Sequence, residues 1–237
     1  MLPPFSLVIP AFNEAERLGG TLTAALEYLR TSSVGSELIV VDDGSTDATS
    51  DIVREVFRGK DGAECRLIQN LTNHGKGAAV REGLLAATRP IALFSDADFS
   101  TPITEASKLL DPIISGELDV TFGSRALDRR LIGNRQDWYR EQGGRVFNLV
   151  VRLATGLPYW DTQCGFKAFR LETFRPLLKQ ARSNGFGFDV EFLYLAHKAD
   201  LRMREIPVRW NHHDGSKVDF LRDSRRMLQE VIALRRA

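Results

Sequence analysis

The amino-acid sequence predicts an α/β protein, a single domain whose mostly parallel sheet is flanked by helices. In the first half of the 237 residues, short apolar runs alternate with segments that have apolar residues at helix spacing. This alternation is typical of a parallel sheet. Hydrophobic residues make up 43% of the chain, which is enough to bury a sizeable core. Polar clusters follow five of the apolar runs, at the strand ends where ligands bind in such sheets.

The elements are expected in a regular order along the chain. The first strand is expected at residues 5–9, and the first helix at residues 16–30, where leucines and alanines recur at helix spacing. The later strands are expected at residues 37–41, 66–69, 91–94 and 119–123, and the helices between them after Thr46, at 76–87 and at 104–114. An arginine-rich helical stretch then runs to about residue 157, and a basic helix covers residues 220–237. We expect this C-terminal third to fold back over the edge of the sheet.

The charge and the cysteine content exclude several classes of protein. Thirty-two basic and 31 acidic residues give a formal net charge of +1, so no overall field attracts nucleic acid. Two cysteines are too few for a disulfide framework, and with four histidines they show no paired spacing for structural zinc. No run reaches the ~18 apolar residues of a membrane span, and the N-terminus lacks a signal-peptide pattern. The sequence therefore predicts a cytoplasmic protein.

Asp96 and Asp98 directly follow the apolar run at residues 91–94. Residues i and i+2 of a strand lie on the same side, so both carboxylates can converge at the strand end. Adjacent carboxylates repel each other unless a cation is present, and oxygen ligands suit Mg²⁺ or Mn²⁺ bound to substrate phosphates. A turn with helix-capping acids is the alternative interpretation. The preceding strand favours the metal site.

Three further clusters follow strands and admit plainer interpretations. Asp42 and Asp43 add like charge at a strand end, where a carboxylate could accept hydrogen bonds from a base or a ribose. Residues 45–47 are explained by helix capping. Residues 10–14 could form a plain turn. Lys76, in a short glycine-containing segment, is weak evidence for a phosphate loop when taken alone.

Together and in this order, these clusters resemble the family-2 glycosyltransferases of the Rossmann-like GT-A fold. In the first half the matching motifs are Val8-Ile-Pro-Ala-Phe-Asn-Glu14, Val41-Asp-Asp-Gly-Ser-Thr-Asp47, Asn73-His-Gly-Lys-Gly77 and Asp96-Ala-Asp98. The second half is similar to the dolichyl-phosphate β-glucosyltransferases and their bacterial polyprenyl-phosphate relatives. The motifs there are Phe122-Gly-Ser-Arg125, Asp161-Thr-Gln-Cys-Gly-Phe-Lys167, Phe186-Gly-Phe-Asp-Val-Glu191, Val208-Arg-Trp-Asn211 and Asp214-Gly-Ser-Lys217. The resemblance covers residues 5 to about 226.

The resemblance implies an inverting, metal-dependent transfer of glucose from UDP-glucose to a polyprenyl or dolichyl phosphate. It assigns the nucleotide sugar to residues 1–125 and the acceptor to residues 126–237. Asp96 and Asp98 would hold Mg²⁺ or Mn²⁺ on the donor diphosphate. The implied contacts to the nucleotide sugar are Pro10, Ala11, Glu14, Asp42 or Asp43, Lys76, Asp96, Ala97 and Lys217. Related mannosyltransferases have a glutamine ligand where this chain has Ser100, so a different metal shell is expected here.

A dianionic acceptor phosphate needs positive charge to approach the donor diphosphate more than it needs a base. The candidates for this charge are Arg125, Arg135, Arg140, Arg145 and Lys217. A solvated basic face is the alternative interpretation. The resemblance singles out Arg125 and Arg140 as phosphate-binding, and Asp161 as the residue that orients or activates the acceptor. An alcohol acceptor would need one of Asp161, Asp189 and Glu191 as general base. For Asp189 and Glu191, stabilisation of a helix N-terminus is the alternative interpretation.

The acceptor side leaves alternatives open. Residues 146–157 carry apolar side chains near two arginines and could lie in a membrane interface. An ordinary buried helix explains that pattern equally well. Attachment of this kind would be peripheral, on the inner face of the membrane. The alternative functions are transfer to a soluble or glycan hydroxyl, use of GDP-mannose as donor, and non-catalytic binding of a nucleotide sugar.

Overall fold

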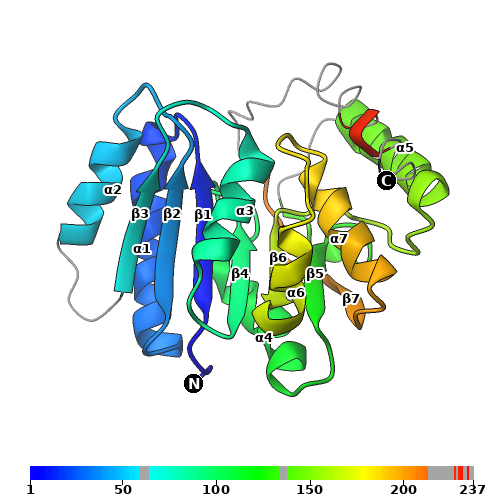
Figure 1. Ribbon diagram of the computed structural model, residues 1–237, viewed down its shortest axis with the longest axis horizontal. Helices are drawn as coiled ribbons and strands as arrows, with labels where there is room; N and C mark the ends of the chain where they lie inside the picture. Colours follow the sequence, from blue (N-terminus) through cyan, green and yellow to red (C-terminus); the bar gives the residue numbers. More distant parts are fainter. Residues whose placement is uncertain (59–63, 134–137, 213–226, 228, 232–233, 235–237) are drawn as a thin grey trace.

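The computed structural model describes residues 1–58, 64–133, 138–212, 227, 229–231 and 234 (Figure 1). Within this part of the chain, seven strands form one sheet in the order β3-β2-β1-β4-β6-β5-β7. Their bounds are β1 Ser6–Ala11, β2 Glu37–Asp42, β3 Glu64–Gln69, β4 Ile91–Ser95, β5 Val120–Ser124, β6 Phe166–Arg170 and β7 Met203–Pro207. The five strands predicted from the sequence are all present, with ends shifted by one or two residues.

The sheet is parallel except for one strand. Strands β1, β2, β3 and β4 pair in parallel, as do β5 and β7. Strand β6 pairs antiparallel with β4 on one side and with β5 on the other. The expected mostly parallel α/β sheet is therefore confirmed, and β6 and β7 are elements that the sequence pattern did not predict.

Helices cover both faces of the sheet and make three layers. Their bounds are α1 Ala15–Ser32, α2 Thr49–Arg58, α3 Lys76–Ala86, α4 Ala106–Ile114, α5 Trp138–Thr155, α6 Leu171–Leu178 and α7 Phe188–Lys198, with short 3-10 helices at Ile103–Glu105 and Arg129–Leu131. Helices α3, α6 and α7 contribute to one apolar cluster and lie in front of the sheet in Figure 1, while α1, α2 and α4 contribute to the other. Successive residues of a strand point to opposite faces, so Val8 joins the first cluster while Leu7 and Ile9 join the second.

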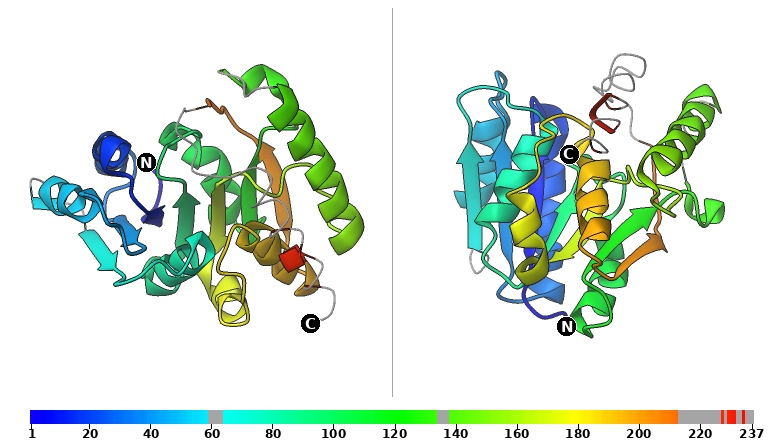
Figure 2. Two further views of the ribbon diagram at one scale, coloured as in Figure 1. Left: turned by 90° about the horizontal axis from the view of Figure 1, so that it is seen from above. Right: turned by 45° about the vertical axis from the view of Figure 1, so that its right-hand side comes forward.

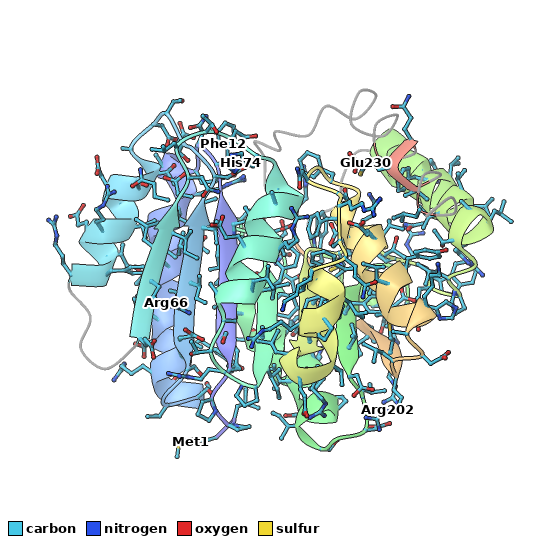
Figure 3. The ribbon with its side chains drawn as sticks, viewed as in Figure 1. Met1, Phe12, Arg66, His74, Arg202 and Glu230 are labelled. Carbon is cyan, nitrogen blue, oxygen red and sulfur yellow. The ribbon has the colours of Figure 1, made fainter. Side chains whose placement is uncertain are left out.

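The carboxyl ends of β1 to β5 lie at one edge of the sheet because these strands run in the same direction. Phe12, which follows β1, and His74, which follows β3, mark this edge at the top of Figure 3, and Arg202 lies at the opposite edge. The predicted polar clusters all follow these strands, so they share one rim. Strand β6 runs the other way, and its first residue, Phe166, begins at the same rim.

The C-terminal third contains more structure than the sequence pattern predicted. The arginine-rich stretch contains α5, which begins at Trp138 and lies at the β7 end of the molecule (Figure 2). Of the basic helix expected at 220–237, the described residues are 227, 229–231 and 234, and each is helical. Among the described helices, none is long and apolar enough to cross a membrane.

Candidate active site

The loops after β1 and β2 are tied together by side-chain hydrogen bonds. Asn13, with a left-handed φ of 55°, accepts a hydrogen bond from the backbone N–H of Thr46 at 2.8 Å and donates its own N–H to Ser45 Oγ at 2.8 Å. The Glu14 N–H donates to Thr49 Oγ1 at 2.8 Å. Pairing of this kind holds the ends of two neighbouring strands at a fixed separation. The expected capping of the next helix by Ser45 or Thr46 is wrong, because both bind Asn13 and α2 begins only at Thr49. Asp47 accepts the N–H groups of Thr49 at 3.0 Å and Ala15 at 3.2 Å, at the starts of α2 and α1.

Asp42 and Asp43 are both buried and both bind loops of the protein. Asp42 accepts hydrogen bonds from the Ser45 N–H at 2.9 Å and from the Ser50 hydroxyl. Asp43 accepts the N–H groups of His74 at 3.0 Å and of Gly75 at 2.7 Å. Gly75 has a φ of +103°, a conformation that favours glycine. The carboxylates that were predicted to contact a nucleoside therefore shape the walls of the site, and a direct contact stays a prediction.

Pro10, Ala11 and Ala97 reach the rim through their backbones. Pro10 and Ala11 are the last two residues of β1 and are buried. The Ala11 carbonyl accepts the Asp43 N–H at 2.9 Å. The Ala97 carbonyl accepts the Thr21 hydroxyl at 2.7 Å, which ties the loop after β4 to helix α1. The predicted nucleotide-sugar positions that the structure describes thus lie at one rim, whereas Lys217 is outside the described residues.

Lys76 forms an ion pair with Asp96 across the rim. Lys76 is the first residue of α3, and its Nζ lies 2.6 Å from Asp96 Oδ1. Burial lowers the pKa of Lys76, but Asp96 and Asp189 more than compensate, and the net pKa is raised. For Asp96, burial and the neighbouring Asp98 raise the pKa, although Lys76 opposes them. Lys76 therefore remains charged and partly neutralises the carboxylates.

The two aspartates fit a divalent cation that is bound mainly through substrate. The Asp96 Oδ1 atom is buried, and in the described part of the chain its partner is the Lys76 ammonium, in the ion pair. Asp98 Oδ1 accepts the Ser100 N–H at 2.9 Å. Within the described residues no cluster of three or more histidine, cysteine or acidic residues could hold a metal unaided. Mg²⁺ and similar cations use one or two carboxylates together with waters and phosphates, which is what this pair offers.

Arg17 belongs to the same rim, although the sequence reasoning did not select it. It pairs with Glu14, and this hydrogen bond is the largest contribution that raises the Arg17 pKa; Asp98 and Asp96 add to it. Glu14 was expected to contact the nucleotide sugar, and here its carboxylate faces an arginine three residues along α1. The i,i+3 spacing from Glu14 was the available signal for this pair.

Arg125 and Asp161 form a bidentate ion pair beside these donor-side residues. Arg125 Nε and Nη2 lie 2.7 and 2.8 Å from the two carboxylate oxygens, and the Arg125 N–H donates to Oδ2 at 3.0 Å. Asp161 is buried. Burial raises its pKa, yet the charge and hydrogen bonds of Arg125 outweigh this and the net pKa is lowered. Asp161 is thus ionised and engaged, which suits orientation of Arg125 better than proton abstraction.

Glu205 of β7 holds this pair in place, and the sequence pattern gave no sign of it. Its carboxylate accepts the Asp161 N–H at 2.8 Å and the Ser124 hydroxyl at 2.6 Å through Oε1, and the Trp160 N–H at 2.9 Å through Oε2. Ser124 ends β5 directly before Arg125. One side chain from an edge strand therefore supports both halves of the ion pair.

Gly165 connects the Arg125–Asp161 pair to the carboxylates after β4. The Gly165 carbonyl accepts the Asp96 N–H at 3.0 Å. A Cβ atom at this position would lie 2.0 Å from Asp96 Oδ2, so a larger residue would displace the aspartate. The glycine in the motif Asp161 to Lys167 is thereby explained by a close approach of the two loops.

Asp189 and Glu191 have structural partners. The fully buried Lys167 pairs with Asp189 and donates to the Cys164 carbonyl at 2.6 Å. Glu191 accepts the N–H groups of Arg182 and Ser183, each at 2.8 Å. These contacts favour the structural interpretation of the two acids over a role as general base.

Some predicted residues fall outside what the structure describes. Arg135 and Lys217 lie outside the described residues. Arg140 and Arg145 are on α5, but their side chains are outside the described part. Their assignment to the acceptor phosphate stays a prediction.

The chain is similar in sequence to known proteins. The family model described as glycosyl transferase family 2 matches residues 6–178. The dolichyl-phosphate β-glucosyltransferase of Drosophila melanogaster is 39% identical over 225 residues, which cover 90% of this chain and 68% of that protein. The enzyme of the same name from Dictyostelium discoideum is 32% identical over 240 residues, covering 97% and 73%.

The fold has a counterpart among solved structures. Glucosyl-3-phosphoglycerate synthase from Mycobacterium tuberculosis, in complex with Mn²⁺, UDP and glucosyl-3-phosphoglycerate, superposes with a TM-score of 0.71. The alignment covers 98% of this chain and 79% of that one at 20% sequence identity. At this identity the likeness concerns the fold.

Proposed function

Because the chain belongs to glycosyl transferase family 2, we propose that it transfers glucose from UDP-glucose to a polyprenyl phosphate, with inversion at the sugar. The observation that supports this most is that Gly165, four residues after Asp161, accepts the Asp96 N–H, so the loop that holds the Arg125–Asp161 pair meets the end of β4. A cationic group for an acceptor phosphate thus lies beside the carboxylates proposed for the donor. Similarity to dolichyl-phosphate β-glucosyltransferases over 90% or more of the chain supports the same pairing of substrates.

On this proposal, residues 1–125 bind the nucleotide sugar and residues 126–237 bind the acceptor. The loops held by Asp42 and Asp43 would contact the nucleoside, together with Pro10 and Ala11 at the end of β1. Lys76 and Arg17 supply positive charge near the diphosphate. A divalent cation held by Asp96 and Asp98 would neutralise charge on the departing diphosphate. The carboxylates of Asp96 and Asp98 are suitable ligands for both Mg²⁺ and Mn²⁺.

The transfer itself requires no base from the protein. An oxygen of the dianionic acceptor phosphate attacks the anomeric carbon, and a new carbon–oxygen bond forms. The bond from that carbon to the β-phosphate oxygen breaks, and UDP leaves with the electron pair. A phosphate monoester has a second pKa near ~6, so at neutral pH no proton has to be removed. Arg125 positions the nucleophile and lowers its repulsion with the donor, and Asp161 holds the guanidinium in place.

With a lipid phosphate as acceptor, the transfer takes place at a membrane surface. We propose peripheral attachment, from the cytoplasmic side. The aliphatic part of the acceptor would then remain in the bilayer while its phosphate reaches Arg125.

The test is acceptor-dependent release of UDP from UDP-glucose in the presence of Mg²⁺ or Mn²⁺. The acceptors to compare are a short-chain polyprenyl phosphate in detergent, the matching polyprenol without phosphate, and 3-phosphoglycerate; GDP-mannose replaces UDP-glucose in a parallel series. We expect stimulation by the polyprenyl phosphate alone and with UDP-glucose alone. Stimulation by the polyprenol or by 3-phosphoglycerate, with none by the lipid phosphate, would overturn the proposed acceptor.

A further inference from the structure

Helix α5 is apolar on two faces, and only one of them packs against the part of the protein that the structure describes. Phe147 and Val151 pack into the core cluster formed with α3, α6 and α7. Val146, Leu149 and Leu153 have exposed fractions of 62%, 54% and 73%. At 100° per residue the two stripes lie roughly 140° apart around the helix. A surface helix needs one apolar stripe to pack on its own protein, so the second stripe is not accounted for by the fold.

Arg152 of the same helix contacts a tryptophan that adjoins the acceptor side of the site. Trp160 is 56% exposed, and the Arg152 guanidinium lies 4.0 Å from the centre of its ring. Arg152 makes no ion pair within the described part of the chain. Trp160 directly precedes Asp161, the partner of Arg125. We name Val146, Leu149, Leu153 and Trp160, with Arg152, the α5 apolar surface.

We propose that the α5 apolar surface docks on the face of a lipid bilayer, beside the acceptor site; this inference rests on the proposed lipid-phosphate acceptor. Exposed aliphatic side chains, a tryptophan at their border and an arginine without an acidic partner are the composition of an interfacial helix. The arginine stem can lie along the apolar surface while its charge meets lipid phosphates. Docking here would bring the bilayer surface next to Arg125, where the acceptor phosphate is proposed to bind.

A second copy of the chain is a less suitable occupant. A dimer formed through this surface would cover Trp160, and Trp160 and Asp161 are consecutive and bound to the same Glu205 carboxylate. The route by which an acceptor reaches Arg125 would then be narrowed. A bilayer in the same position is itself the source of the acceptor.

The test combines vesicle flotation with turnover on two acceptors. The double variant Leu149→Glu with Leu153→Glu is compared with the wild type and with Val34→Glu, which is 65% exposed but lies before β2 at the opposite edge of the sheet. Vesicles contain phosphatidylcholine with anionic phosphatidylglycerol and no polyprenyl lipid. We expect partitioning of the double variant to fall by about tenfold or more, and that of Val34→Glu to match the wild type.

Turnover separates this inference from the proposed function. The double variant should lose activity on long-chain polyprenyl phosphate in vesicles, yet remain within about twofold of wild type on a water-soluble, very short prenyl phosphate. A wild type that fails to float, or a double variant that floats equally well, would overturn the docking surface. A dimer that the double variant converts to monomer would assign the surface to a second copy. No turnover with either acceptor would instead contradict the proposed function and leave the flotation result standing.

Discussion

The carboxylates of the site differ in how far the protein itself satisfies them. Asp42, Asp43 and Asp161 each accept two or more hydrogen bonds from the chain. In the described part of the chain, Asp96 Oδ1 has the ion pair with Lys76 but no hydrogen bond, and Asp98 Oδ1 accepts a hydrogen bond from the Ser100 N–H. Buried carboxylate oxygens without partners are costly unless a ligand completes them. We therefore propose different roles for the two groups: the first shapes the loops of the site, and the second binds a ligand.

The substitution Asp98→Asn should remove turnover while leaving the fold intact. Loss of one charge-stabilising group at a reacting diphosphate reduces kcat by about 10²-fold or more. Asp51→Asn is the matched control, because Asp51 lies on α2 with a side chain that is 84% exposed. UDP release and calorimetric titration of Mn²⁺ in the presence of UDP are the measurements. Equal Mn²⁺ binding by the two variants would contradict the assignment of Asp98.

The Arg125–Asp161 pair should make stability depend on pH in a defined window. The Asp161 pKa is lowered in the folded protein, so its stabilising effect is present above its unfolded pKa of about 4 and is lost as the pH falls through the lower, folded value. Asp161→Asn should cost about 2–3 kcal/mol at pH 7, less than a fully buried pair because Arg125 is partly exposed.

Unfolding in urea at several pH values measures this effect. The difference in free energy of unfolding between wild type and Asp161→Asn should be constant from pH 7 to about 5 and shrink below about 4. Asp51→Asn, which removes the exposed partner of Arg54, should show no comparable loss. A difference that persists unchanged in acid would mean that the ionised pair is not its source.

At the scale of elements, the position of helix α3 depends on its close packing against the sheet. A Cβ atom on Gly83 would lie 2.4 Å from Val8 Cγ1 and 3.0 Å from Val41 Cγ2. Gly83→Ala should therefore destabilise the protein by about 1–3 kcal/mol, although alanine is the better helix former. Gly20→Ala on α1 is the control: nothing lies within 4 Å of its Cβ, and it should stabilise by about 0.5–1 kcal/mol. The urea midpoint of unfolding is therefore expected to fall in Gly83→Ala and to rise in Gly20→Ala. A change of the same sign in both variants would contradict the close packing at Gly83.

Strand β6 shows why part of the fold was not predictable from local pattern. Lysine is among the residues least often buried, so Lys167 within Phe166–Arg170 gave no indication of a central strand. The Lys167 ammonium can be fully buried because it donates a hydrogen bond to Asp189, which lies on α7, 22 residues later in the chain. The five strands of the first half were predictable because their apolar runs are uninterrupted and buried, except at the edge strand β3.

At the scale of the whole molecule, the site depends on contacts between the two halves of the chain. The motifs on the sheet rim predicted which residues would gather there, and the resemblance to family 2 predicted their class of reaction. Neither indicated that Arg125 and Asp161, predicted separately, would form one pair, or that Glu205 would support both. The two residues in each contact are separated by 36 and by 44 positions in the chain. Separations of this length produce no periodic pattern in the sequence.

The central claim, that glucose is transferred to a lipid phosphate, is tested most directly by the mass of the lipid product. The wild-type chain is incubated with UDP-glucose, Mn²⁺ and a short-chain polyprenyl phosphate, and the extracted lipid is analysed by mass spectrometry. A lipid phosphate heavier by one hexosyl group, formed in equal amount to UDP and absent with Asp98→Asn, is the predicted result. UDP release with an unchanged lipid mass, or a hexosyl group found on polyprenol and not on its phosphate, would contradict the account.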